Sequence, residues 1–90
     1  MGTSRRPRPL RLGGKLRQIR LSLDLTQEQI GKKLEKPKAP VRPGHVSEFE
    51  TGKREPSLLV LLAYARLARI PMEILVDDDI ELPDKLPRRK

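Results

Sequence analysis

The sequence has 90 residues, enough for one domain with a modest core but with little area to spare for a catalytic cavity. It contains no cysteine, which excludes disulfide bridges and cysteine-based metal sites. The 20 Lys and Arg residues exceed the 12 Asp and Glu residues and give a formal charge of +8, which favours a polyanionic partner.

The positive charge is concentrated near the start of the chain. From Arg5 to Arg20 there are seven basic residues and no acidic one. The chain has one Phe and one Tyr, so it lacks the aromatic platforms on which proteins stack single-stranded nucleic acid. These features favour duplex DNA as the polyanion. A solvated basic tail is the alternative interpretation of the same charges.

Proline and charge mark both ends of the chain as arms. Prolines among arginines indicate a basic flexible arm over residues 1–9. Acids and prolines indicate a charged, poorly ordered tail over residues 77–90, which leaves one domain over residues 10–76. No apolar run approaches the roughly 20 residues that cross a bilayer, and no apolar stretch of signal-peptide type is present. A cytoplasmic protein without a membrane partner is therefore expected.

Two helices are predicted over the first part of the domain. The first carries an apolar stripe at helical spacing, made of Leu12, Leu16, Ile19 and Leu23. The second runs from about Gln27 to Leu34 and buries Ile30. It begins with a capping box, in which the Thr26 hydroxyl accepts the N–H of Gln29 while the Gln29 side chain reaches back to residue 26.

A long turn separates the second helix from the third. Three prolines within residues 35–44 interrupt the helical pattern. The third helix is predicted to begin at about Pro43, where a missing N–H costs nothing, and to end at Thr51. Gly52 then stops the helix in the left-handed conformation.

Two further helices complete the predicted fold. Ser57 is expected to cap the fourth helix, whose buried stripe would consist of Leu58, Leu61, Leu62, Ala65 and Ala68. Further apolar residues lie beside that stripe, at Leu59, Val60, Ala63 and Leu67. Pro71 ends this helix and begins a short fifth one. Because no segment alternates as a strand does, the prediction is an all-α, compact domain of five helices.

The segments around the third helix resemble a known DNA-binding family. Residues 25–31 read LTQEQIG, and residues 46–58 read VSEFETGKREPSL. Together with the first helix, this pattern resembles the Cro/C1-type (XRE-like) helix-turn-helix domains of lambdoid phage repressors. The resemblance implies a lambda-repressor-like fold that binds double-stranded DNA sequence-specifically as a transcriptional repressor, with the third helix in the major groove. It also implies a homodimer on DNA and a bacterial or phage-encoded protein associated with the nucleoid.

The resemblance also implies which residues face DNA and which hold the fold. The candidate DNA-binding residues are Thr26, Gln27, Arg42, Pro43, Gly44, His45, Ser47, Glu48, Thr51, Lys53 and Arg54. Arg20 and Glu50 are expected to form a partly buried ion pair that places the third helix. Gly31 is expected to let that helix approach the second one closely. No catalytic residue, metal site or cofactor is implied.

The recognition helix departs from the family's usual pattern. Pro43 and Gly44 offer no side-chain donor, and the turn before them is longer than usual. Base reading is therefore expected to involve the basic residues of this extended turn, with Arg42 matched to guanine O6 and N7. His45 is expected to be a surface or phosphate-facing residue. Glu48 either accepts a hydrogen bond from cytosine N4 or repels phosphate.

Other functions are weighed against DNA binding. An enzyme is disfavoured by the single histidine and the absence of a glycine-rich phosphate loop, and the acids at 77–79 are interpreted as solvated charge rather than a cation site. The stronger alternative is a protein-interaction module, such as an antitoxin-like component that docks a toxin-like partner on its fourth helix and its C-terminal Ile80, Leu82 and Leu86. The same helix would equally suit a second copy of the chain.

Overall fold

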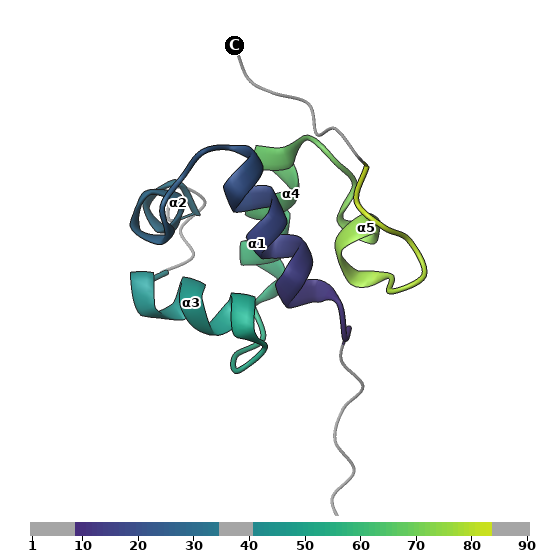
Figure 1. Ribbon diagram of the computed structural model, residues 1–90, viewed down its shortest axis with the longest axis horizontal. Coiled ribbons are helices and arrows are strands. Elements are labelled where there is room, and N and C mark those ends of the chain that lie inside the picture. The colour runs from purple at the N-terminus through teal and green to yellow at the C-terminus, as the bar shows by residue number, and fades with distance from the viewer. Residues whose placement is uncertain (1–8, 35–40, 84–90) are drawn as a thin grey trace, which may run out of the picture.

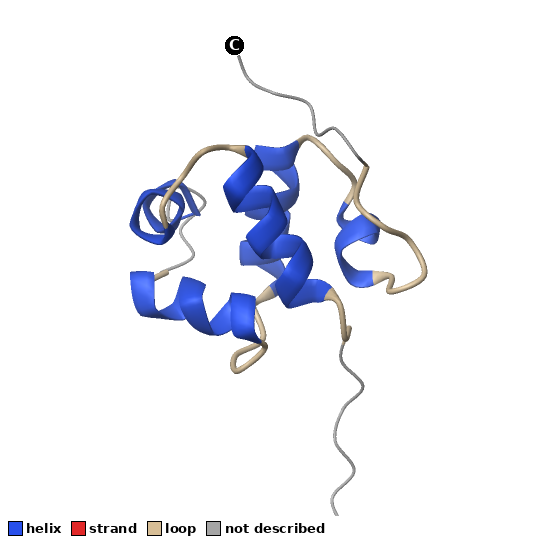
Figure 2. Ribbon diagram, viewed as in Figure 1, coloured by secondary structure: helices blue, strands red, loops and turns tan. Residues whose placement is uncertain are grey.

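The computed structural model describes residues 9–34 and 41–83, without the side chain of Pro43. Five helices occur in this part of the chain: α1 (Leu12–Ser22), α2 (Gln27–Leu34), α3 (Pro43–Thr51), α4 (Leu58–Ala68) and α5 (Met72–Val76). No strand occurs in these two described ranges (Figure 2). The all-α prediction with five helices is confirmed.

Helix α1 lies at the centre of the fold and packs against α3, α4 and α5. Figure 1 shows α2 and α3 on one side of α1, α5 on the other side, and α4 behind it. α2 also packs on α3 and α4. The side chains that are fully shielded from solvent include Leu16, Ile19, Ile30, Leu34, Val46, Tyr64 and Leu75. All five helices thus contribute to one core, and none of those in the described ranges has the length and apolarity needed to cross a membrane.

Short-range signals place the helix ends as the sequence predicts. The Gln29 N–H donates to the Thr26 hydroxyl (3.1 Å), and the Thr26 N–H donates to Gln29 Oε1 (2.8 Å), which completes the capping box. The Ser57 hydroxyl accepts the N–H of Val60 (3.2 Å) at the start of α4. Gly52 ends α3 with φ +81°, in the left-handed region that favours glycine.

Helix α4 buries Leu61, Ala65 and Ala68 of the predicted stripe, but its buried surface is wider than that stripe and leaves out Leu58. Leu58 is 75% exposed, whereas Val60 and Ala63, expected beside the stripe, are buried in the core. The reason is that α1, α2 and α5 all pack on α4, so apolar residues around much of its circumference are covered. Leu59 is 54% exposed. The second apolar face that supported a partner-binding helix is therefore mostly part of this chain's own core.

Gly13, and not Gly31, is the glycine that close helix packing requires. A Cβ on Gly13 would lie 2.8 Å from the carbonyl oxygen of Glu50 and 2.9 Å from that of Phe49, at the contact between α1 and α3. A Cβ on Gly31 would meet its nearest neighbour, a methyl group of Val46, at 3.7 Å, which is an ordinary van der Waals contact. The expectation that Gly31 is needed for a close approach is wrong.

Lys15 is buried, with 4% of its surface exposed, although it belongs to the basic run at the start of the chain. Its ammonium group donates hydrogen bonds to the carbonyl oxygens of Ile74 (2.6 Å), Asp77 (2.8 Å) and Ile80 (2.6 Å). These carbonyls belong to α5 and the turn that follows it. Lys15 therefore ties α1 to this turn and is not available to a polyanion.

Residues 77–83 pack against the start of α1. The Asp78 carboxylate accepts hydrogen bonds from the backbone N–H groups of Leu10 (2.8 Å) and Arg11 (3.0 Å). Leu82 is 8% exposed and joins the core, so it is not available to dock on a partner, while Leu86 lies outside the described residues. The boundary predicted at residue 76 stays a prediction, but the described residues after it contact the helices.

Candidate nucleic-acid interface

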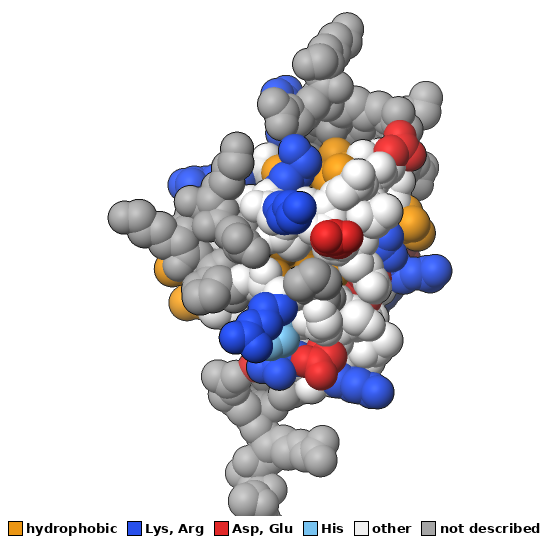
Figure 3. Space-filling view, turned by 90° about the vertical axis from the view of Figure 1, so that its left-hand side faces the viewer, with side chains coloured by type: hydrophobic (Ala, Val, Ile, Leu, Met, Phe, Trp, Pro, Cys, Tyr) orange, Lys and Arg blue, Asp and Glu red, His pale blue; other side chains and the backbone are white. Residues whose placement is uncertain are grey.

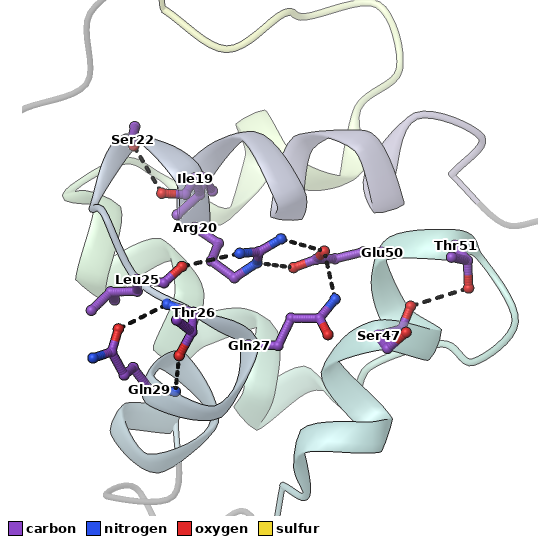
Figure 4. A network of polar contacts seen from close by, with 10 residues as sticks. All are labelled: Ile19, Arg20, Ser22, Leu25, Thr26, Gln27, Gln29, Ser47, Glu50 and Thr51. Carbon is purple, nitrogen blue, oxygen red and sulfur yellow. Dashed lines mark hydrogen bonds and ion pairs between the residues drawn. The ribbon is translucent and has the colours of Figure 1, made fainter.

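An ion pair between α1 and α3 fixes α3 on the face that is turned toward the rest of the domain. Arg20 Nε lies 2.7 Å from Glu50 Oε2, and Arg20 Nη2 lies 3.1 Å from Glu50 Oε1. Arg20 also donates to the carbonyl of Leu25 (3.0 Å), which leads into α2 (Figure 4). The Arg20 and Glu50 side chains are 13% and 4% exposed, and the hydrogen bond to Glu50 raises the pKa of Arg20. The pair expected from the family resemblance is present.

Gln27 belongs to the same network. Its amide nitrogen donates to Glu50 Oε1 (3.2 Å), so the first residue of α2 is tied to the last turn of α3 (Figure 4). Gln27 was expected among the DNA contacts, and no local sequence pattern indicates this internal bond, which joins residues 23 positions apart. Thr26, just before it, is exposed, and its hydroxyl accepts the N–H of Gln29. The backbone at the start of α2 is thus fixed by its own cap.

The outer face of α3 carries few side chains that can reach outward. Gly44 is exposed, and a Cβ placed on it would have no neighbour within 4 Å. Thr51 turns its hydroxyl back to the carbonyls of Ser47 (3.1 Å) and Glu48 (3.3 Å). The His45 ring lies 6.4 Å from the ring of the buried Phe49. Glu48, another candidate residue of α3, has a longer polar side chain than Gly44, Thr51 or His45.

Glu48 is paired with Arg54, another of the candidate residues. Arg54 Nε lies 2.6 Å from Glu48 Oε1, and the two side chains are 41% (Glu48) and 48% (Arg54) exposed. This hydrogen bond, aided by the charges of Arg54, His45 and Lys53, lowers the pKa of Glu48. The backbone N–H groups of Lys53 and Arg54 also bond to the carbonyl of Glu48 (2.9 and 3.2 Å). The carboxylate is therefore ionised and fixed by the loop after α3.

Exposed cations lie at both ends of α3. Arg42 precedes the helix in an extended conformation and makes no ion pair with any other described residue. Lys53 follows the helix and is exposed. Figure 3, which views the side that carries α2 and α3, shows basic side chains at several places with acidic ones between them. The lysines of the extended turn, Lys36 and Lys38, lie outside the described residues.

The arrangement holds no sign of metal chemistry in the part of the chain that the structure describes. No group of three or more His, Cys, Asp or Glu side chains in these residues could hold a metal ion. Of the acids at 77–79, Asp78 is engaged by backbone N–H groups, and these bonds hold its pKa below the usual range. Asp78 therefore makes a structural contact and is not a freely solvated charge.

Comparison with known proteins agrees with the geometry of α2 and α3. A family model for helix-turn-helix domains matches residues 16–75, two thirds of the chain. No curated protein matches the chain. The match begins within α1 and ends within α5, so it spans the two packed helices and the elements that support them. The chain belongs to the Cro/C1-type helix-turn-helix family of DNA-binding domains.

Proposed function

We propose that the domain binds double-stranded DNA sequence-specifically, with α3 in the major groove, and that it acts as a transcriptional repressor. The proposal rests on one observation: side chains of α1 and α2 hold the inner face of α3, while its outer face is exposed to solvent. Glu50 is held by Arg20 and Gln27, whereas Gly44 and Thr51 on the opposite side are exposed. The major groove of B-DNA is wide enough to admit a helix presented in this way.

The charges at the ends of α3 suit the backbone of a duplex. Arg42 and Lys53 are exposed at the two ends of the helix. The guanidinium group of Arg42 and the ammonium group of Lys53 can neutralise phosphates there. The N–H groups at the start of α2, next to Thr26, can take a further phosphate. Such contacts set register and affinity, and base contacts set specificity.

The dimer on DNA is part of the same proposal. Repressors of this architecture read two half-sites about one helical turn apart, which requires a symmetric pair of domains. The exposed Leu58 and Leu59 at the start of α4 are the described apolar side chains of that helix left for a partner. A toxin-like protein partner has less support, because Val60 and Ala63 are buried and Leu82 is covered within the chain.

Salt-dependent binding to duplex DNA tests the proposal. Fluorescence anisotropy with a random-sequence duplex from about 50 to 200 mM salt should give a steep fall in affinity, and each phosphate contact should add about 0.9 to the slope of log affinity against log salt. Arg42→Ala and Lys53→Ala should each flatten the slope by about that amount. Arg66→Ala, which removes the same charge from an exposed position of α4, is the matched control.

The outcomes separate DNA binding from a protein interface. A slope that Arg42→Ala and Lys53→Ala flatten and Arg66→Ala leaves in place supports the proposal. Equal effects of all three variants would mean that net charge alone attracts DNA. Absence of binding at micromolar protein and low salt would contradict the proposal.

A further inference from the structure

Glu48 lies where a base-reading side chain would be needed. An α-helix places residues four apart on one face, so Gly44 and Glu48 share a stripe, with Thr51 on the next turn. This stripe is opposite the buried Val46 and Phe49. Gly44 has no side chain, and the hydroxyl of Thr51 is bonded within the helix. Glu48 is thus the residue of the stripe with a long polar side chain.

An acid in this place has an electrostatic cost that Arg54 offsets. A carboxylate close to DNA phosphates is repelled, and the repulsion is strong where water is excluded. Here Arg54 Nε lies 2.6 Å from Glu48 Oε1, so the pair presents little net charge to the duplex. One guanidinium N–H is used in this bond, and the other nitrogens of Arg54 can still face a phosphate.

We propose that Glu48, neutralised and positioned by Arg54, reads a cytosine through its N4 amino group in the major groove. This inference rests on the proposed function, because it assumes that α3 enters the groove. The hydrogen bond from Arg54 uses Oε1 of the carboxylate, which leaves Oε2 to accept a hydrogen bond from the base. Glu48 is the specificity-determining residue, and Arg54 is a positioning residue.

Cytosine fits this acceptor better than the other bases. An ionised carboxylate accepts hydrogen bonds and donates none, and the major-groove edges of guanine and thymine offer it no amino donor. Adenine offers its N6 amino group, but N7 beside it is an acceptor that would face the carboxylate. On cytosine the ring atom beside N4 in the major groove is C5–H, which is not an acceptor, although O6 of the paired guanine lies on the other side of N4. The depressed pKa of Glu48 means that the carboxylate stays ionised at neutral pH.

The experiment is a comparison of base preference between the wild-type chain and Glu48→Gln. A binding site is selected from a random duplex library with the wild-type chain, and each position is then replaced by the other three base pairs. At one position, replacing the C·G pair should weaken wild-type binding about 5- to 150-fold, the usual range for one mismatched base pair in a specific site. Glu48→Gln should lose that preference and favour adenine there, because an amide pairs with adenine N6 and N7.

Arg54→Ala tests whether Arg54 positions and neutralises Glu48 or only adds a positive charge that attracts DNA. In the wild-type background it should weaken binding by more than the loss of one phosphate contact, because it leaves Glu48 unneutralised. In the Glu48→Gln background the same change should cost less, so the two substitutions should be coupled. Both side chains are more than 40% exposed, and circular dichroism should show that the variants fold normally.

Glu73→Gln is the matched control, since it removes one exposed negative charge from α5. It should leave base preference unchanged. If Glu48→Gln raises affinity for all four duplexes equally, Glu48 only repels DNA and the inference is overturned while DNA binding stands. If the wild type binds no duplex at low salt, the proposed function itself fails.

Discussion

Gly13→Ala is expected to destabilise the domain, whereas the same change at the next residue, Gly14→Ala, is expected to stabilise it. Both glycines lie in the first turn of α1. A Cβ at Gly13 would lie 2.8 Å from the carbonyl oxygen of Glu50 and 2.9 Å from that of Phe49, whereas a Cβ at Gly14 would have no neighbour within 4 Å. The two variants therefore differ in packing and share their gain in helix propensity.

The magnitude follows from these distances. Alanine is more favourable than glycine in a helix by about 0.5–1 kcal/mol, and Gly14→Ala should gain about that amount. At Gly13 the Cβ meets backbone atoms of α3, which Arg20 holds in place through Glu50. Overpacking of this kind costs about 1–3 kcal/mol, so the two variants should differ in unfolding free energy by about that amount.

Urea unfolding followed by circular dichroism measures the difference directly. Each kcal/mol corresponds to a shift of about 4–8 °C in melting temperature for a domain of this size, so thermal melts offer a second readout. Gly31→Ala extends the comparison, since its Cβ would make an ordinary contact at 3.7 Å and the variant should be at least as stable as the wild type. Equal stability of Gly13→Ala and Gly14→Ala would refute the packing argument.

Three further predictions concern the polar contacts that hold α1. Lys15→Met should cost about 3 kcal/mol because three carbonyls lose a charged donor, whereas Arg17→Met on the exposed side of α1 should cost little; urea unfolding of both variants checks this. Arg20→Met should lower the unfolding free energy by about 3 kcal/mol, because it leaves Glu50 buried without its main partner. Adding Glu50→Leu should restore part of that loss. Equal stability of Arg20→Met and wild type in thermal melts would contradict the buried pair. Asp78, whose pKa backbone hydrogen bonds lower, should stabilise the fold above the ordinary carboxyl pKa of about 3.9 and lose this effect as the pH falls through the lower folded value. Asp78→Asn should therefore lower stability at neutral pH and flatten its decline in acid, and an unchanged pH profile in urea titrations would count against the contact.

The features that the sequence predicted correctly depend on residues close together in the chain. The capping box involves Thr26 and Gln29, three positions apart, and the cap of α4 joins Ser57 to Val60 in the same way. Gly52 ends α3 through its own backbone angle. Each of these signals acts within a single helix turn, so local spacing was sufficient to place the helix ends.

The features that were missed depend on contacts between distant parts of the chain. Gly13 is needed because of the carbonyls at residues 49 and 50, and no local pattern distinguishes it from Gly14. Asp78 bonds to groups 67 and 68 residues away. Lys15 did leave a signal, since it lies three positions after Leu12 on the buried stripe of α1, where a solvated lysine is not expected.

The same distinction between local signals and contacts between distant residues applies to the candidate site. The family resemblance, rather than any local spacing, supplied the ion pair between Arg20 and Glu50, because the two residues are 30 positions apart. The bond between Glu48 and Arg54 was not anticipated, since it crosses the turn at Gly52. The outer face of α3 is therefore better defined by the structure than by the sequence pattern.

The most direct test of α3 as the DNA-reading helix is a titration of the isotope-labelled chain with a duplex, followed by backbone amide NMR. If α3 reads the DNA, the largest shifts should fall on residues 42–54 and on the start of α2, with small changes in α4 and α5. The amide of Gly44 is the key reporter, because this exposed residue has no side chain and no neighbour within 4 Å of the Cβ position. Shifts centred on Leu58 and Leu59 with an unchanged α3 would contradict the central claim that α3 is the DNA-reading helix.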